Sequence, residues 1–414
     1  MTYKLRLHQI KASKEVLGVL NTYKCVYLRG EVRSGKTLTV LETAKLYRAK
    51  SVLFLTKKKA ISSILSDYNN FGYTYDIEVI NYESVHKVVN TEPDLVIYDE
   101  AHVLSAFPKP SKRVKIIKKM FSSIPCIWLS GTPAAESNSQ YFHQLSVSDY
   151  SPFKKYKNFY AWANDAVNVT EKLIGTHTVK DYTKLIPEAW ELINAMLGLF
   201  TVTMTQKDAG FKVKIKEHLI RIETPEVLHK LAQRLIKDRA IEGKKGFIMA
   251  EMPAKLQSKV HQIYNGTCIL EDIEGESIPH IFSDYKAKYI KDNFKDKKIA
   301  IMYYYQSELE ILKIVFGDNI TTDLDEFNDT DKNFAIQQSS TEGTNISKAD
   351  CLVYYNFHFS GKNYIQSRDR LTIKDRENND VYFILETPGI NEEILNRVRD
   401  KKDFNLSAFK KSFL

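Results

Sequence analysis

The sequence contains few cysteines, prolines and glycines: 4, 11 and 16 among 414 residues. The low glycine and proline contents exclude a collagen-like or low-complexity chain. The cysteines lie far apart in short apolar runs, and none belongs to a CxxC pair, which argues against a disulfide scaffold or a zinc site. We therefore interpret all four as reduced thiols in a hydrophobic core. They are Cys25, Cys126, Cys268 and Cys351.

Long apolar runs are also missing. No stretch approaches the roughly eighteen apolar residues that a membrane-spanning helix needs. The first residues, MTYKLRLHQIKAS, lack the apolar region of a signal peptide. We therefore expect a cytoplasmic protein that has no membrane partner.

The composition is typical of a large globular protein. Apolar residues make up 43% of the chain and charged residues 27%, and the length predicts two or three domains. Lys and Arg number 60 against 51 Asp and Glu, which gives a formal net charge of +9. This excess is compatible with a polyanionic partner but does not by itself indicate one.

Short apolar runs alternate with helical patterns in the first third of the chain. Between the first two runs, apolar residues recur at helical spacing. This alternation predicts a parallel sheet covered on both faces, with ligands bound at the carboxyl ends of its strands. The predicted strands are 25–28, 51–55, 77–80, 94–98 and 126–130.

A phosphate-binding motif follows the first predicted strand. The segment GEVRSGKT (30–37) matches GxxxxGK[ST] in the strand–loop–helix context that the motif requires. Its glycines let backbone N–H groups surround a phosphate, and the helix N-terminus adds its positive dipole end. Lys36 is expected to reach the β- and γ-phosphates, and Thr37 to bind Mg²⁺. The nucleotide-binding residues predicted in this motif are Gly30, Ser34, Gly35, Lys36 and Thr37.

Two further predicted strands end in polar motifs. The strand 94–98 leads into DEAH, and a carboxylate directly after a buried strand is costly unless it meets solvent or a cation. With a phosphate loop in the same sheet, we assign Asp99 to Mg²⁺ and Glu100 to polarisation of the attacking water. The strand 126–130 leads into SGTP, where small hydroxyl groups such as that of Thr132 could sense the nucleotide state.

A second alternating region begins near Ser283. The apolar run 299–305 leads into a helical pattern at 307–316, and three more apolar runs follow. This pattern predicts a second parallel-sheet domain, which has no phosphate loop of its own. The three later runs are 335–340, 351–356 and 381–385.

In their order and spacing, GEVRSGKT, DEAH and SGTP resemble the motor core of superfamily 2 helicases and translocases. The later motifs are most similar in spacing to phage-encoded helicases related to the Swi/Snf-type ATPases. The resemblance implies an α/β fold of two RecA-like parallel-sheet lobes, with an inserted helical or mixed segment between them. It also implies an ATP hydrolase with ATP and Mg²⁺ as cofactors and DNA as partner.

The resemblance also assigns residues outside the phosphate loop. Gln9, in LRLHQ, corresponds to a glutamine motif and is implicated in adenine recognition. The blocks FLTKKK (54–59) and INYES (80–84) match positions that contact the nucleic-acid backbone, although a lysine triplet is also common in solvated loops. The block STEGTNI (340–346) resembles a loop that couples nucleotide to DNA, and it adds Gly343 to the nucleotide-binding residues. The nucleic-acid-binding residues so implied are Lys57, Lys58, Tyr82, Thr132, Thr344 and Asn345.

The segment YIQSRDR resembles the arginine-finger motif of the same family. A planar guanidinium can stabilise a transferring phosphoryl group from the opposite lobe, so hydrolysis would require both lobes. The family spacing Q-x-x-x-R-x-x-R places the first arginine at Arg370 and the second at Ile373. Either the finger is single, or the second arginine is replaced by Arg368, Lys374 or Arg376.

The part of the chain between the two alternating regions fits neither sheet by pattern. The predicted domains are therefore 1–150, 151–282 and 283–414. In the middle domain, Thr224 and Pro225 predict a capped helix start, with Val227 on its apolar face. Three lysines alternate with apolar residues on one face of a predicted strand, which suggests a DNA-gripping element. They are Lys212, Lys214 and Lys216.

A cluster of six cations without an acid follows the DEAH motif. The pattern is equally compatible with a solvated helix face and with a contact to DNA or protein. The six are Lys109, Lys112, Arg113, Lys115, Lys118 and Lys119. Near the C-terminus, the residues from Asn391 predict a capped amphipathic helix that packs on the second lobe.

Together these motifs predict an ATP-dependent DNA helicase or translocase, which couples ATP hydrolysis between two lobes to movement along the nucleic-acid backbone. The alternatives are a DNA remodeller or branch-migration translocase without strand separation, and an RNA helicase. A degenerate motor that acts as an adaptor is disfavoured because the expected catalytic residues are intact. Replication or recombination proteins are the expected protein partners, and a host cytoplasm the expected location if the chain is phage-encoded.

Overall fold

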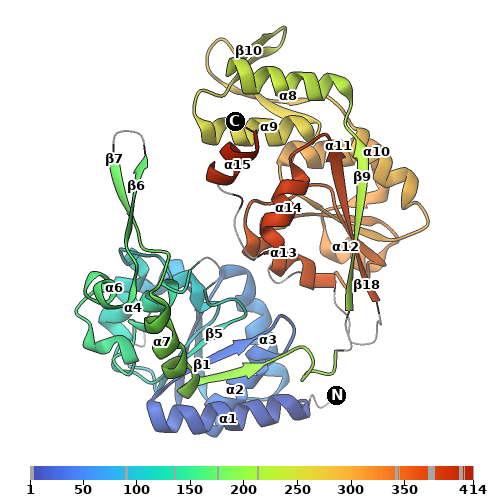
Figure 1. Cartoon of the computed structure of the whole chain (residues 1–414). Helices are drawn as coiled ribbons and strands as arrows, with labels where there is room; N and C mark the ends of the chain where they lie inside the picture. The colour runs from blue at the N-terminus through green and yellow to red at the C-terminus, as the bar shows by residue number, and fades with distance from the viewer. Residues whose placement is uncertain are drawn as a thin grey trace. The chain divides into compact units, whose positions relative to one another are not determined.

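The computed structural model divides the chain into two compact units, Met1–Phe211 and Lys212–Leu414 (Figure 1). We call them unit 1 and unit 2 and describe each by itself. The residues described are 4–88, 92–134, 137–174, 177–211, 214–340, 344, 346–371, 378–400, 404 and 406–413.

Unit 1 is built on a six-stranded sheet with the order β3-β2-β4-β5-β1-β8, in which every neighbouring pair is parallel. Five of its strands are the apolar runs predicted from the sequence, and β8 is an addition. Because all the strands run the same way, their carboxyl ends meet at one edge, where the polar motifs follow. The strands are β1 (Cys25–Gly30), β2 (Ser51–Thr56), β3 (Asp76–Asn81), β4 (Leu95–Tyr98), β5 (Cys126–Ser130) and β8 (Thr201–Met204).

Helices cover both faces of this sheet because successive strand side chains point to opposite faces. Val26 and Leu28 pack in the core under the first three helices, whereas Cys25 and Tyr27 pack in the core on the opposite face. The first face carries α1 (Leu7–Tyr23), α2 (Lys36–Leu46) and α3 (Ile61–Asn70). The opposite face carries α4 (Lys112–Phe121), α5 (Gln140–Leu145), α6 (Phe159–Ala166) and α7 (Pro187–Leu199).

Short elements complete unit 1. An antiparallel hairpin of β6 (Thr170–Ile174) and β7 (His177–Asp181) follows α6 and extends away from the body of the unit in Figure 1. The 3₁₀ helices are η1 (Lys58–Ala60), η2 (Tyr82–Lys87), η3 (Ala101–Leu104) and η4 (Pro152–Lys155).

Unit 2 contains a second six-stranded parallel sheet, with the order β15-β16-β14-β17-β18-β9. Its strands are β9 (Lys214–Glu223), β14 (Ile299–Tyr303), β15 (Ile320–Thr321), β16 (Asn333–Gln337), β17 (Cys351–Tyr354) and β18 (Asn378–Thr387). Its helices from α10 onward are α10 (Tyr285–Asn293), α11 (Gln306–Phe316), η5 (Gly317–Asn319), α12 (Leu324–Asp329), η6 (Gln338–Ser340), α13 (Gly361–Arg368), η7 (Asp369–Leu371), α14 (Asn391–Arg399) and α15 (Leu406–Phe413). The predicted fold class, two RecA-like parallel-sheet lobes, is confirmed.

A smaller antiparallel sheet with the order β10-β11-β12-β13 also belongs to unit 2. Its residues share a hydrophobic core with one helix before it, one helix between its second and third strands, and the large sheet, so it is not a separate body. Its strands are β10 (Ala240–Gly243), β11 (Gly246–Met249), β12 (Thr267–Glu271) and β13 (Ser277–Ile281), and its helices are α8 (Glu226–Asp238) and α9 (Pro253–Tyr264).

The expected middle domain 151–282 is divided between the two units. Its strand β8 pairs with β1 in unit 1, and β9 pairs along ten residues with β18 in unit 2. Because each strand extends the edge of a lobe's sheet, the observed division falls between residues 211 and 212 rather than at 150 and 282. Lys212 lies outside the described residues, as does the Lys214 side chain, and Lys216 is exposed on β9.

The start of α8 differs from the predicted cap. The helix begins at Glu226 and has no side-chain cap; the Thr224 hydroxyl donates to the Pro388 carbonyl and accepts no N–H of the helix. Val227, expected on the buried face, is 76% exposed. Leu228 and Leu235, on the predicted apolar face of the helix, are buried as expected.

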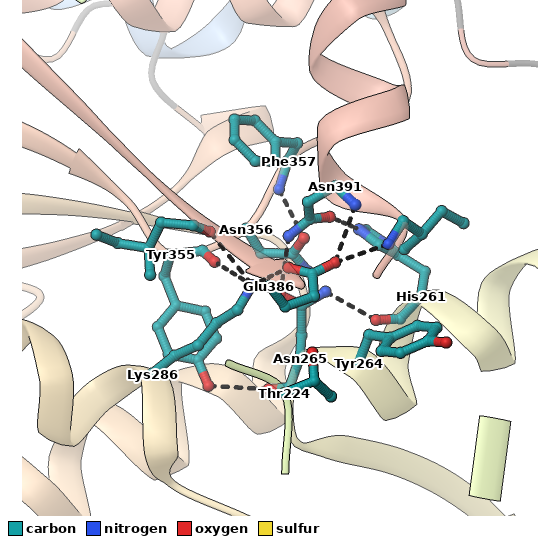
Figure 2. Close-up of polar contacts among 12 residues, drawn as sticks. Thr224, His261, Tyr264, Asn265, Lys286, Tyr355, Asn356, Phe357, Glu386 and Asn391 are labelled. Atoms are coloured by element: carbon teal, nitrogen blue, oxygen red, sulfur yellow. Dashed lines mark hydrogen bonds and ion pairs between the residues drawn. The ribbon is translucent and has the colours of Figure 1, made fainter. Parts of the chain in front are cut away.

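The core of unit 2 contains a fully buried ion pair, Lys286 with Glu386 (Figure 2). The Lys286 Nζ lies 2.6 Å from Glu386 Oε2 and donates to Asn265 Oδ1 at 2.6 Å. The other Glu386 oxygen accepts the backbone N–H groups of Ile390 and Asn391, both at 2.9 Å. Glu386 therefore caps the N-terminus of α14, the amphipathic helix predicted from Asn391, which buries Ile394 and Leu395 in the core of unit 2.

We predict that Lys286→Met destabilises the protein strongly, because it leaves the Glu386 carboxylate buried without its cation. Breaking such a pair from one side costs about 3–5 kcal/mol in the free energy of unfolding. Lys288→Met on the same helix is the matched control, since Lys288 is 65% exposed and pairs with Asp284 at the surface. It should cost less than about 1 kcal/mol. Urea unfolding of both variants tests this prediction, and equal stabilities would contradict it.

Candidate active site

The phosphate loop joins β1 to α2 and depends on glycine at both of its ends. Gly35 has a φ of 88°, and a Cβ there would lie 2.3 Å from Gln9 Nε2. A Cβ on Gly30 would lie 2.4 Å from Lys36 Cγ. Larger residues at either position would therefore force the loop and its neighbours apart.

The predicted nucleotide-binding side chains of unit 1 lie together around this loop. Lys36 Nζ donates to the carbonyls of Gly30 at 2.8 Å and Glu31 at 3.1 Å. The buried Gln9 amide lies 3.4 Å from the Gly35 carbonyl, so the glutamine motif contacts the loop directly. Ser34 is also buried, and Thr37 lies half-buried in the first turn of α2, which contains no acidic residue.

The acidic pair Asp99–Glu100 follows β4 directly, at the same edge of the sheet. Asp99 Oδ2 accepts the Thr56 hydroxyl at 2.7 Å, and the Asp99 N–H donates to the Leu55 carbonyl at 2.8 Å. Both partners lie at the end of the neighbouring strand β2. Glu100 has a φ of 48°, a left-handed conformation that is unfavourable for a residue with a Cβ and that is concentrated at functional sites.

A polar chain links the acidic pair to the SGTP motif. His102 Nδ1 lies 3.1 Å from Glu100 Oε2 and 3.1 Å from the Ser130 hydroxyl. The Thr132 N–H donates to the same hydroxyl at 3.2 Å. Thr132 Oγ1 is buried and forms no hydrogen bond with any described residue. A change at Glu100 can therefore reach Thr132 through two side chains.

The two carboxylates differ in basicity. Burial and the neighbouring Glu100 raise the pKa of Asp99 to about 6, against smaller opposing effects of Thr56 and Lys36. Burial would also raise the pKa of Glu100, but its contact with His102 and the charges of Lys36 and Lys57 hold that pKa well below its usual range. Environments that separate two carboxylates in this way are typical of acids with different roles.

Two of the residues predicted to contact nucleic acid, Tyr82 and Lys57, are less exposed than such a contact requires. Tyr82 is 1% exposed, and its hydroxyl donates to the Asp99 carbonyl at 2.6 Å. This corrects its predicted role, because the side chain supports the acidic turn from inside the core. Lys57 is half-buried and influences Glu100, whereas Lys58 is exposed on η1. Lys58 is thus the better placed of the two for a nucleic-acid backbone.

The predicted site residues of unit 2 are described in part. Gly343, Asn345, Ile373, Lys374 and Arg376 lie outside the described residues, and Thr344 is half-buried.

The two arginines of the finger motif lie on adjoining elements. Arg368, at the end of α13, lies 3.4 Å from Glu217 Oε1 and over the Tyr364 ring. The other Glu217 oxygen lies 2.6 Å from Arg399 Nη2. Arg370 follows on η7 and is half-buried. Arg368 is thus anchored within unit 2.

Three residues of these sites were not predicted to take part. Thr56 could have been found, because it is a polar residue directly after an apolar strand of the same sheet. His102 is visible in DEAH, but its contact with Ser130 depends on the order of the strands. Glu217 lies about 150 positions before Arg368, and no local pattern indicates the pair.

The chain matches no known protein-family model, and no curated protein is significantly similar to it. Within the described part of the chain, no helix is both long enough and apolar enough to span a membrane. All four cysteines are buried free thiols, as predicted.

Proposed function

We propose that the protein is an ATP hydrolase that moves along nucleic acid. One observation carries the proposal: a glycine-bounded loop with Lys36 at a helix N-terminus shares a sheet edge with Asp99 and Glu100. The loop suits a phosphate chain, since the Lys36 ammonium lies at the loop and the first turn of the helix that follows contains no acidic residue. The Thr37 hydroxyl and the Asp99 carboxylate are oxygen donors of the kind that Mg²⁺ prefers.

Each residue then has a distinct task. Lys36 exchanges its loop carbonyls for the β- and γ-phosphate oxygens of ATP, while Thr37 and Asp99 hold the ion. A Mg²⁺ ion held by these two oxygen donors would neutralise the charge that develops on the phosphates. Glu100 orients the attacking water and accepts its proton. His102 and Ser130 relay the state of this carboxylate to Thr132.

Unit 2 supplies the proposed arginine finger. Arg370 is the candidate that stabilises the phosphoryl group, because it stands at the first arginine position of the motif that the sequence resembles. Hydrolysis would then depend on both units, and alternate closing and release would move the protein along a phosphate backbone. DNA is the proposed substrate, replication or recombination proteins the proposed partners, and a cytoplasm the proposed location, in line with the four free thiols.

ATP turnover measured with single-stranded, duplex and forked DNA, and with RNA, tests this function. We expect stimulation by DNA, together with unwinding of the fork. Stimulation by duplex without unwinding would favour a remodeller, and stimulation by RNA alone would favour an RNA helicase. No ATP turnover with any of these nucleic acids would contradict the proposal.

We predict different consequences for the two neighbouring lysines. Lys58→Gln should reduce the slope of log affinity against log salt by about 0.7–0.9, because one phosphate contact is lost, and should spare basal hydrolysis. Lys57→Gln should reduce hydrolysis as well, because Lys57 acts on Glu100. DNA titrations across salt and ATPase assays separate the two effects. Identical behaviour of the variants would contradict this division.

A further inference from the structure

The cation cluster that follows the DEAH motif borders a cavity of about 160 Å³ on the outer side of unit 1. Three stretches of chain line it: α4 with the segment before it, the helix α5 with the residue after it, and the start of α6 with the segment before it. These elements cover the sheet face opposite the one that carries α1 to α3. The phosphate loop contributes no residue to this cavity.

Positive charge dominates the cavity lining. Four lysines take part, all of them exposed, and no Asp or Glu lines the cavity. None of the four forms an ion pair within the described part of the chain, whereas Arg113 of the original cluster pairs with Glu83 at 3.0 Å. The four are Lys109, Lys115, Lys118 and Lys157.

Two helix N-termini lie beside these lysines. Ser111 caps α4, and Asn158, itself a lining residue, caps α6 through the Ala161 N–H. The first turn of each helix contains no acidic residue. The dipole ends thus add to the lysine charges, and the cavity favours an anion.

Aromatic rings form the remaining wall. Phe159 is buried and stacks on His143 with ring centroids 5.6 Å apart. Burial, with a smaller effect of Lys118, lowers the pKa of His143, so this ring is neutral at physiological pH. Tyr156 is half-buried and Tyr160 is 42% exposed, which leaves ring surface available to a ligand. An anion with an attached flat ring matches this combination.

We propose that this cavity binds one nucleotide unit of a single-stranded nucleic acid, outside the motor motifs. Lys115, Lys118 and Lys157 hold the backbone phosphates, and a base lies against Tyr160. A cavity of this size admits a single base or phosphate but not a duplex. The proposal deepens the proposed function, on which it rests for its nucleic-acid partner.

The cavity is also connected to the hairpin. Tyr182 directly follows β7, and its ring packs against Phe159 at 5.5 Å and Tyr160 at 5.9 Å between centroids. A strand held in the cavity therefore passes beside the base of the hairpin, and its binding can be transmitted to β6 and β7.

The test uses the full chain and a fluorescent oligothymidylate, with affinity measured by anisotropy across salt concentrations. Lys115→Gln with Lys118→Gln should reduce the slope of log affinity against log salt by about 1.4, since single strands contribute roughly 0.7 for each phosphate contact. Lys112→Gln with Lys119→Gln is the matched control, because it removes the same charge from the same helix outside the cavity. We expect its slope to stay close to that of the unmodified protein. Equal salt slopes for the two double variants would overturn the proposal. The cation cluster would then be interpreted as a solvated helix face or as a contact to protein.

A second variant tests the base contact. Tyr160→Leu should weaken binding of the oligothymidylate roughly tenfold, the scale of one base–aromatic contact, and leave binding of inorganic polyphosphate unchanged. An equal loss of affinity for the oligothymidylate and for polyphosphate would contradict stacking of a base on Tyr160. If AMP displaced the oligonucleotide at an equal nucleotide concentration, the ligand of the cavity would be a free nucleotide. That result would overturn the proposal that the cavity binds a nucleic-acid strand.

Failure of the inference and failure of the proposed function can be distinguished. Lys36→Ala should weaken ATP binding and keep the cavity's contribution to the salt slope. If the protein never hydrolysed ATP but showed the expected salt slopes, the proposed motor function would be wrong and the proposed nucleic-acid site would stand. A DNA-stimulated ATPase whose salt slope is the same in both lysine double variants would keep the motor and lose this site.

Discussion

Replacing Arg370 with alanine should reduce ATP hydrolysis by about a thousandfold or more, the scale on which an arginine finger acts in phosphoryl transfer. ATP binding and DNA binding should change little, because the finger contributes mainly when charge moves onto the leaving phosphates. Single-turnover hydrolysis, measured beside equilibrium ATP affinity, separates these quantities. Arg370→Lys should recover little activity, since an ammonium group cannot reproduce the planar guanidinium.

Arg368→Ala is the matched control for this prediction. The Arg368 guanidinium is already engaged by the Glu217 carboxylate, and the same carboxylate accepts Arg399 and the Tyr364 hydroxyl. These contacts lower the pKa of Glu217 despite its partial burial, as expected of a carboxylate that stays ionised between two cations. Loss of Arg368 should therefore loosen α13 and reduce hydrolysis only modestly. A larger loss of hydrolysis for Arg368→Ala than for Arg370→Ala would reverse the assignment.

The fold was predictable from the sequence to the extent that its elements are local. Each central strand of unit 1 is a short apolar run, because a strand that is buried on both faces needs apolar side chains at consecutive positions. The edge strand β8 carries no such signal, because the solvent tolerates polar residues at a sheet edge. The alternation at 212–216 predicts the start of β9 as a strand, but it does not show to which sheet this strand belongs. The predicted domain boundaries therefore differ from the observed ones, since β8 and β9 belong to the sheets of different units.

The candidate site was predictable where one motif carries both the chemistry and the position. Gly30, Lys36 and Asp99 lie where strand–loop reasoning places them. The Tyr82 side chain lies elsewhere than predicted. A side chain directly after a strand can point into the core or into solvent, and the sequence pattern is the same in both cases. Its hydroxyl supports the Asp99 backbone, a contact between two strand ends that only the order of the sheet brings about.

Glu100→Gln and Lys36→Ala should both abolish useful turnover, for different reasons. Glutamine keeps the size of Glu100 and its left-handed backbone but cannot accept the proton of the attacking water. Hydrolysis should therefore fall by about a hundred- to ten-thousandfold while ATP remains bound. Lys36→Ala removes a charged hydrogen bond to phosphate and should weaken ATP affinity itself by about ten- to a hundredfold.

Equilibrium binding of a fluorescent ATP analogue, measured beside turnover, distinguishes the two variants of this last pair. Glu83→Gln serves as the carboxylate control, because Glu83 is exposed, pairs with Arg113 at the surface and lies on η2 outside the acidic turn. Its turnover should match that of the unmodified protein. If Glu100→Gln and Lys36→Ala lost ATP affinity equally, Glu100 would be a binding residue, and the division between phosphate binding and water activation at this sheet edge would be wrong. If Glu100→Gln kept full turnover, the water would have to be oriented by the other carboxylate, Asp99, and the assignment of the ion to Asp99 would fall with it.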